Sequence, residues 1–216
     1  VQTKPRGLAE AFILGESFIE DDRVALVLGD NVFHGQSFSS YLKEAAESDK
    51  NVIFGYPVRN PQDYGVAELN ADGSIHSLVE KPKEPHSNLA IPGLYFYNSD
   101  VVDVAKTVEP SARGELEITS INEVYLKRGE LELIRLGRGM AWLDTGTVSN
   151  LHEAAAYVAY IQSRQGLYVS CIEEIAWRRG FISLEQLEKM GKEMEATEYG
   201  QYLLYLVRTA RDERFN

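Results

Sequence analysis

The stretch VALVLGD, residues 24–30, decides the fold. Val24 to Leu28 form a short, continuous apolar run that Gly29 closes. Such a run is typical of a strand buried on both faces, as in parallel sheets. Asp30 follows directly. Because ligands of open α/β sheets bind at the carboxyl ends of strands, Asp30 is a candidate metal ligand. Taken alone, it is equally well a loop residue that caps the next turn.

A second carboxylate occurs in WLDTGT, residues 142–147. Asp144 alone would be an ordinary turn residue. Two such carboxylates, far apart in the sequence and each after a strand-like run, indicate a magnesium site, because Mg²⁺ prefers hard oxygen ligands. The pair therefore predicts metal-assisted phosphoryl chemistry.

Strand and helix patterns alternate up to Thr147, which predicts an α/β sheet. Gly65–Leu69 and Ile75–Val79 read as a hairpin, and Asp72-Gly73 between them favours a type I′ turn. The other strand patterns are at 52–58, 93–97 and 131–136, and the helix patterns at 9–18, 38–46, 100–108 and 117–127.

Only helix patterns follow. Ser170 with Glu173 and Ser183 with Gln186 are candidate capping boxes. We therefore expect an α/β domain over 1–165 and a helical C-terminal extension over 166–216. The apolar helix stripes are Leu151, Ala154, Ala155 and Val158, and then Tyr199, Tyr202, Leu203, Leu206 and Val207.

Composition limits the function classes. The chain has 216 residues, with 22 Lys and Arg against 33 Asp and Glu, a net charge of −11. That charge argues against nucleic acid or an anionic membrane as the main partner. Cys171 is the one cysteine, so an intramolecular disulfide and a cysteine metal cluster are excluded. No apolar run approaches a membrane span and no signal peptide is recognisable, so we expect a cytoplasmic protein.

Further candidates bind substrate. Glu80-Lys81-Pro82 ends the hairpin, and a Lys before Pro is expected to be extended, which limits where its ammonium points. The motif is either a phosphate and sugar ligand or a solvated charge pair. Gly65, after Tyr64, would let a ligand approach the backbone closely, or is an ordinary turn glycine. Arg113-Gly114-Glu115 at a helix entry is consistent with simple capping.

Seven motifs in this order resemble the bacterial glucose-1-phosphate thymidylyltransferases, within the sugar nucleotidyltransferase family. The stretch RQGLYVSCIEEIAWRRGFI at 164–182 favours the thymidylyl branch. The motifs are GLAEAF at 7–12, LGDN at 28–31, YGV at 64–66, EKP at 80–82, GLYFY at 93–97, RGELEIT at 113–119 and WLDTGT at 142–147.

The resemblance implies a Rossmann-like three-layer α/β/α fold and a role for each matched residue. Asp30 and Asp144 would bind Mg²⁺, and Lys81 would meet the sugar phosphate. The implied thymine contacts are Gln2 and Gly7, with Leu8 lining the base pocket, and the implied sugar pocket consists of Tyr64, Gly65, Glu80 and Ile91.

The implied reaction joins dTTP and glucose 1-phosphate into dTDP-glucose and pyrophosphate, for dTDP-rhamnose biosynthesis. The family's members are usually homotetramers that bind the end-product nucleotide at a regulatory site. The family also begins with a G-x-G-T-R-L loop and a following lysine, and neither occurs here. We therefore expect an N-terminally truncated fold whose 216 residues alone are inactive, because preorganised phosphate donors are missing. Two alternatives stay open: another nucleotide or sugar phosphate, and a non-catalytic nucleotide-binding or oligomerisation fragment.

Overall fold

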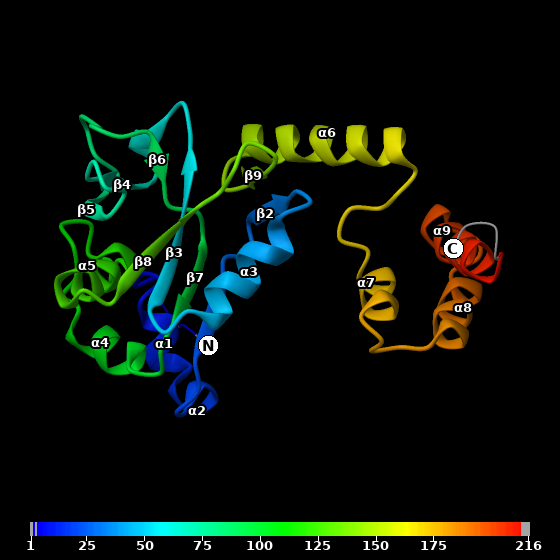
Figure 1. The fold of residues 1–216 in the computed structure, drawn as a ribbon, viewed down its shortest axis with the longest axis horizontal. Coiled ribbons are helices and arrows are strands. Elements are labelled where there is room, and N and C mark those ends of the chain that lie inside the picture. The colour runs from blue at the N-terminus through cyan, green and yellow to red at the C-terminus, as the bar shows by residue number, and fades with distance from the viewer. Residues whose placement is uncertain (1, 3, 213–216) are drawn as a thin grey trace. The chain divides into compact units, whose positions relative to one another are not determined.

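The computed structural model describes residue 2 and residues 4–212 of the chain. Its contacts divide the chain into two compact units, residues 1–150 and 151–216. The larger unit contains the helices α1 (Glu10–Leu14), α2 (Glu16–Ile19), α3 (Phe38–Glu47), η1 (Pro61–Asp63), α4 (Val101–Thr107) and α5 (Ile118–Arg128) (Figure 1). Its strands are β1 (Val24–Val27), β2 (Asn31–His34), β3 (Asn51–Pro57), β4 (Gly65–Leu69), β5 (Ile75–Glu80), β6 (Leu89–Ala90), β7 (Leu94–Tyr97), β8 (Leu131–Arg135) and β9 (Ala141–Asp144).

Seven of these strands form one mixed sheet, in the order β1-β7-β3-β6-β4-β5, with β8 on β3. Within the described chain, β3 and β8 are its parallel pair and the other pairs are antiparallel. β2 and β9 form a separate antiparallel pair, which the sequence patterns did not reveal. This pair matters for the site, because it joins the two motifs that carry Asp30 and Asp144.

Helices cover both faces of the sheet and confirm the α/β/α layering. On one face, Phe12 of α1, Val101 of α4 and Ile121 of α5 join a core with Ile53 of β3 and Tyr95 of β7. On the other face, α3 packs against the alternate residues of β3, β7 and β8. The predicted helices and strands of this unit are present, with α1 and α2 separated at Gly15.

The expected two-sided burial of β1 is wrong. Its residues alternate between half-buried and exposed, and Val27 is 59% exposed. β1 lies at an edge of the sheet, where β7 is its pairing strand and no other described strand pairs with it. The continuous apolar run therefore predicted the strand correctly, but the burial that it predicted for the two faces is wrong.

The hairpin of β4 and β5 forms as predicted, but its turn is not type I′. Such a turn needs positive φ at both central residues, whereas only Gly73 has it (φ +86°) and Asp72 does not. Gly73 N–H donates to Asn70 O (3.0 Å), and the strand register shifts between Glu68 and Leu69. The loop is thus longer, with one extra residue absorbed as a bulge.

The smaller unit is helical, with α7 (Ile172–Arg178), α8 (Leu184–Glu193) and α9 (Glu198–Arg211) following α6 (Val148–Gln165). The boundary expected near residue 165 corresponds to the end of α6, while the contacts divide at its start. The Ser183–Gln186 capping box is confirmed. The Ser170–Glu173 box is wrong, because Ser170 adopts φ +58° and Cys171 precedes α7 without a side-chain cap.

Candidate active site

A cavity of about 210 Å³ lies at the end of the sheet where β4 begins and β5 ends. It brings together eight of the ten residues that the sequence predicted. Those residues are Leu8, Asp30, Tyr64, Gly65, Glu80, Lys81, Ile91 and Asp144. The remaining lining residues are Leu28, Asn31, Asp63, Gly93, Tyr95, Glu117, Ile118, Thr119 and Trp142.

Asp30 and Asp144 converge because β2 pairs with β9. Asn31 lies opposite Asp144 in this pair, and both the amide and the hydroxyl of Thr145 donate to Asp30 O (2.8 and 2.9 Å). A Cβ placed on Gly146 would lie 3.1 Å from Asp144 Oδ1 and 3.7 Å from Asp30 Oδ2. The two carboxylates therefore lie beside the same space, which is open because Gly146 has no side chain.

This pair suits a magnesium ion better than a metal held by protein alone. Across residue 2 and residues 4–212, no three His, Cys, Asp or Glu side chains gather as a metal cage. Mg²⁺ usually takes one or two carboxylates and completes its shell with water and substrate phosphates. Asp30 and Asp144 line the cavity and supply two carboxylates, which is the number of protein ligands that Mg²⁺ usually takes.

The Asn31 side chain forms three hydrogen bonds to residues that line the cavity. Its Oδ1 accepts from Trp142 Nε1 (2.6 Å) and from Gly93 N–H (3.0 Å), and its Nδ2 donates to Asp30 Oδ1 (2.8 Å). One amide thus ties the small β2–β9 pair to the main sheet and orients a predicted metal ligand. The Trp142 ring also packs on Tyr64, with ring centroids 5.0 Å apart.

Glu80 is fixed by two neighbours. Thr119 Oγ1 donates to Glu80 Oε2 (2.5 Å), and Arg113 reaches Glu80 Oε1 (3.2 Å) as well as Glu117 Oε1 (2.9 Å). Arg113 therefore pairs with carboxylates of the cleft rather than capping α5, which has no side-chain cap. Opposite Glu80 in the sheet is Gly65, whose missing side chain keeps this corner open.

Lys81 does not have the extended backbone that its position before Pro82 predicted. Its φ is +44°, in the left-handed region, which costs a non-glycine residue about 1–3 kcal/mol. Its N–H donates to Tyr64 O (3.0 Å), so the β4–β5 pairing is extended by one bond past Glu80. Within the described residues Lys81 forms no ion pair, which leaves its ammonium for a ligand.

Gln2 and Gly7 do not line this cavity. Gln2 Nε2 donates to Gly7 O (3.2 Å) and to Glu10 Oε2 (2.5 Å), so the two lie together beside it. Gly7 has φ +105°, and a Cβ there would lie 2.4 Å from the backbone oxygen of Leu116. This close approach requires a glycine at position 7. The next residue, Leu8, lines the cavity.

The cleft is electrostatically negative. The pKa of Tyr95 is raised first by burial and then by the charges of Glu80 and Asp30. The pKa of Tyr64 is raised first by burial and then by the charge of Asp144. Both phenols therefore stay protonated, and an anionic ligand would need Lys81 and a cation between it and the carboxylates.

Residues 1–160 match the family model described as nucleotidyl transferase. The chain belongs to the nucleotidyl transferase family. It is 52% identical over 209 residues to a glucose-1-phosphate thymidylyltransferase of Neisseria meningitidis serogroup A, covering 96% of this chain and 73% of that protein. It is 50% identical to the enzyme of that name from Mycolicibacterium smegmatis, over 95% of this chain and 72% of the relative. These identities assign it to the glucose-1-phosphate thymidylyltransferase branch.

Solved structures agree with this nucleotidyl transferase fold. A putative glucose-1-phosphate thymidylyltransferase from Bacillus anthracis, in complex with a sucrose, superposes with a TM-score of 0.64 at 39% identity, over 73% of this chain. The match spans 63% of that structure's chain. A UDP-glucose pyrophosphorylase complexed with UDP-glucose gives a TM-score of 0.65 at 23% identity, which supports the fold alone.

Several lining residues of this nucleotidyl transferase were missed from sequence. Asn31 lay inside the quoted LGDN motif, and Thr119 ended the quoted RGELEIT motif, so both had a signal that was left without a role. Trp142 likewise stood two residues before Asp144. Leu28, Tyr95 and Ile118 also lay inside quoted motifs, LGDN, GLYFY and RGELEIT, but such residues look alike inside and outside a cleft. Asp63 lay outside every quoted motif and looked like an ordinary turn residue.

Proposed function

We propose that the protein transfers a thymidylyl group from dTTP to glucose 1-phosphate, giving dTDP-glucose and pyrophosphate. The observation that carries this proposal is that Asp30, Lys81 and Asp144, from three distant motifs, line one cavity. The names of the relatives supply the substrates, and the cavity supplies suitable ligands for them.

The residues of the cavity divide between the two substrates. Lys81 binds the phosphate of the sugar, and Glu80 accepts hydrogen bonds from sugar hydroxyls beside Tyr64, Gly65 and Ile91. Leu8 borders the base, with Gln2 and Gly7 next to it. A sugar phosphate is already ionised at neutral pH, so its oxygen attacks the α-phosphorus in line without a general base. Positioning and charge neutralisation then lower the barrier.

Magnesium belongs to this proposal. Asp30 and Asp144 would hold the ion, which when bound neutralises phosphate charge in a cleft that is otherwise negative. The chain's own part is to fix these carboxylates: Thr145 holds the backbone of Asp30, Asn31 bonds its side chain, and Gly146 N–H donates to Asp144 Oδ1 (3.0 Å).

A pyrophosphate-release assay on the full-length protein containing this sequence tests the function. We expect turnover with dTTP and glucose 1-phosphate to exceed that with UTP or with other sugar phosphates. Preference for another pair would replace the substrates and keep the chemistry. Binding of dTDP-glucose without turnover on any pair would favour a non-catalytic module. The inactivity of residues 1–216 alone stays a separate prediction.

Replacing Thr119 with Val should raise the KM for glucose 1-phosphate about tenfold, with a smaller change in kcat. The hydroxyl that holds Glu80 Oε2 is lost while the side-chain shape is kept. Steady-state kinetics at saturating dTTP measures this. Thr119→Ser restores the hydroxyl and should recover most of the affinity; equal defects in both variants would contradict a positioning role.

We further propose a cytoplasmic homo-oligomer, a homotetramer as in the resemblance, with dTDP-rhamnose as an effector. No helix in the described part of the chain has the length and apolar character to cross a bilayer. The support for self-association is that α7 has no buried residue, with Ile172 71% exposed and nearby Phe181 80% exposed. Large apolar side chains that are this exposed on one unit indicate an interaction surface.

Replacing Ile172 and Phe181 together with Asp should dissociate the oligomer, because two charges would be buried in an apolar contact. Light scattering coupled to gel filtration would show the mass per particle fall. Lys189→Asp on the exposed side of α8 is the control and should leave the mass unchanged. An unaltered mass in the double variant would remove this surface from the interface.

A further inference from the structure

Two adjacent charged residues, Glu80 and Lys81, line the same active-site cavity. In a regular strand, neighbouring side chains point to opposite faces of the sheet. Glu80 ends β5 on the face of α5, where Thr119 Oγ1 donates to its Oε2 (2.5 Å), and Val79 lies on the opposite face, 39% exposed. A strand that continued through Lys81 would place the lysine on the face of Val79. The chain instead leaves strand geometry at Lys81, whose φ is +44°.

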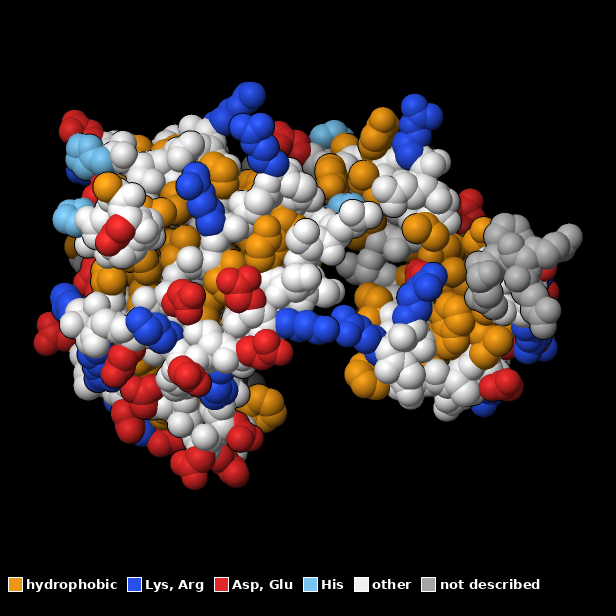
Figure 2. All heavy atoms as spheres, in the orientation of Figure 1, with side chains coloured by type: hydrophobic (Ala, Val, Ile, Leu, Met, Phe, Trp, Pro, Cys, Tyr) orange, Lys and Arg blue, Asp and Glu red, His pale blue; other side chains and the backbone are white. Residues whose placement is uncertain are grey.

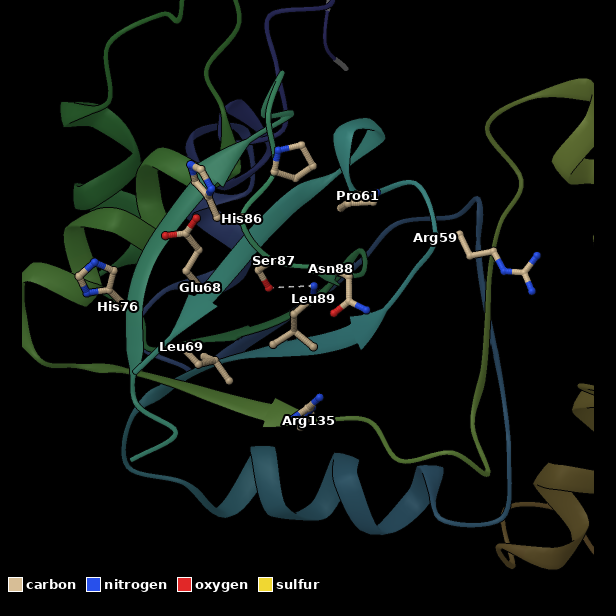
Figure 3. A pocket seen from close by; sticks show the side chains of 11 residues that line it. Arg59, Pro61, Glu68, Leu69, His76, His86, Ser87, Asn88, Leu89 and Arg135 are labelled. Atoms are coloured by element: carbon tan, nitrogen blue, oxygen red, sulfur yellow. Dashed lines mark hydrogen bonds between the residues drawn. The ribbon is translucent and has the colours of Figure 1, made fainter. Parts of the chain in front are cut away.

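The sheet topology makes the chain reverse at this residue. β5 and β6 are both antiparallel to β4, one on each side of it, so both run toward the cavity where β4 begins. Residues 81–88, the return segment, therefore lead back from the cavity to the start of β6. Figure 3 shows the end of this segment, where Ser87 Oγ accepts from Leu89 N–H (3.1 Å). An extended backbone at Lys81 would carry the chain onward past β4 instead of back.

Backbone hydrogen bonds fix both ends of the return segment. At its start, Lys81 N–H donates to Tyr64 O (3.0 Å), and at its end Val58 N–H donates to Asn88 O (2.9 Å). Because the segment is held in this way, the backbone conformation of Lys81 decides where the side chain of that residue points.

Pro82 limits the conformations that remain for Lys81. An L-residue has three main backbone regions: extended, right-handed and left-handed. The reversal excludes the extended region, and the Pro82 ring disfavours the right-handed region, because its Cδ clashes with the residue before it. Lys81 occupies the left-handed region, although this region is strained for a residue with a side chain. Left-handed and right-handed backbones differ by roughly 120° in φ, so they point the side chain in different directions.

The direction of this side chain matters because the cavity is acidic. Lys81 is the one basic residue among the described residues that line it, and the acidic ones are Asp30, Asp63, Glu80, Glu117 and Asp144. The whole chain has a net charge of −11, and Figure 2 shows acidic side chains gathered toward the end that carries α1 and α2. Attraction of a phosphate into the cavity therefore depends on where the Lys81 ammonium lies.

We propose that Pro82 is a positioning residue for binding of the sugar phosphate. By closing the right-handed region to Lys81, it holds the left-handed backbone that points the ammonium into the cavity beside Glu80. Pro82 is not among the described residues that line the cavity, so it acts through Lys81. The inference rests on the proposed function, in which Lys81 binds the phosphate of the sugar.

Isothermal titration with dTDP-glucose, on the full-length protein containing this sequence, tests the proposal. Pro82→Ala reopens the right-handed region to Lys81, so the backbone that is competent to bind becomes a minor population. If about a tenth of the molecules keep it, the apparent Kd rises about tenfold, which is the result that we expect. In a Lys81→Ala background, Pro82→Ala should change the Kd by less than about twofold, because no ammonium is left to position.

A purely structural role of Pro82 would weaken binding equally in both backgrounds and would overturn the inference. An unchanged Kd in Pro82→Ala, or in Lys81→Ala alone, would also overturn it. The titration needs no turnover, so its outcome is separate from failure of the proposed transfer, which would appear in the pyrophosphate-release assay.

Pro85→Ala is the matched control for the titration. Pro85 lies in the same return segment and is half-buried like Pro82, but Glu84 before it does not have a positive φ. We therefore expect Pro85→Ala to keep the Kd within about twofold of the unchanged protein.

A comparison of stabilities tests the left-handed backbone without a ligand, and it decides the question if Pro82→Ala fails to fold. Glycine adopts a positive φ without strain, whereas alanine does not. Lys81→Gly should therefore have a higher urea midpoint than Lys81→Ala, measured by circular dichroism. At Glu84 the order should be the reverse, because glycine there only adds entropy to the unfolded chain. An equal or lower midpoint for Lys81→Gly would overturn the inference.

Discussion

Replacing Asp144 with Asn should lower the turnover of dTTP and glucose 1-phosphate by at least about a hundredfold, and Asp30→Asn should do the same. Each change keeps the shape of the side chain and its nearby hydrogen-bonding atoms but removes a charge from the proposed metal site. The cavity is lined by Asp30, Asp63, Glu80, Glu117 and Asp144, so without the ion the triphosphate meets uncompensated negative charge. Pyrophosphate release from the full-length protein, across a magnesium titration, measures the effect.

The double variant provides the sharper test. If Asp30 and Asp144 hold one ion together, losing the second carboxylate adds little to the loss from the first. We therefore expect the double variant to be about as slow as either single one. Asp103→Asn, with a side chain 85% exposed on α4, makes the same chemical change outside the site and should keep full activity. Losses that multiply would show that the two carboxylates act independently.

Replacing Gly7 with Ala should destabilise the larger unit by about 2–4 kcal/mol. A methyl group there would lie 2.4 Å from Leu116 O, and the φ of +105° is one that side chains rarely adopt. Two hydrogen bonds hold the segment around Gly7 against Leu116. Leu116 N–H donates to Arg6 O (2.6 Å), and Ala9 N–H donates to Leu116 O (3.1 Å). Relieving the clash breaks these bonds and displaces Leu8 from the cavity wall.

Urea denaturation followed by tryptophan fluorescence measures this change. Trp142 lies in the larger unit and Trp177 in the smaller one, so a Trp177→Phe background confines the signal to the unit of interest. Gly114→Ala is the matched control. It also has a positive φ (+79°), but a Cβ there meets open space, so it should cost only the backbone strain of about 1 kcal/mol. Equal costs at both positions would mean that the contact with Leu116 is not limiting.

Local sequence patterns were sufficient for most secondary structure. Periodicity predicted α3, α5, β3, β8 and the β4–β5 hairpin, because these elements depend on which neighbours along the chain are apolar. It missed β2, which is short and half-buried throughout, and β6, which consists of two buried residues. For β9 it revealed the strand-like run before Asp144 but not the pairing with β2. It also predicted a capping box at Ser170, which does not form. A cap depends on the backbone angles as well as on residue type, and Ser170 has a φ of +58°.

The amino-acid sequence by itself determined the residue types of the site: two carboxylates after strand-like runs, a Glu-Lys-Pro end to a hairpin, and the glycine at 65. Only the tertiary structure decided that they meet. Asp30 and Asp144 come together through the pairing of β2 with β9, and Lys81 joins them with a left-handed backbone that the following proline argued against. The reason is physical: propensity acts between neighbours in sequence, whereas the direction of a charged side chain is set by strand register and by the groups packed around it.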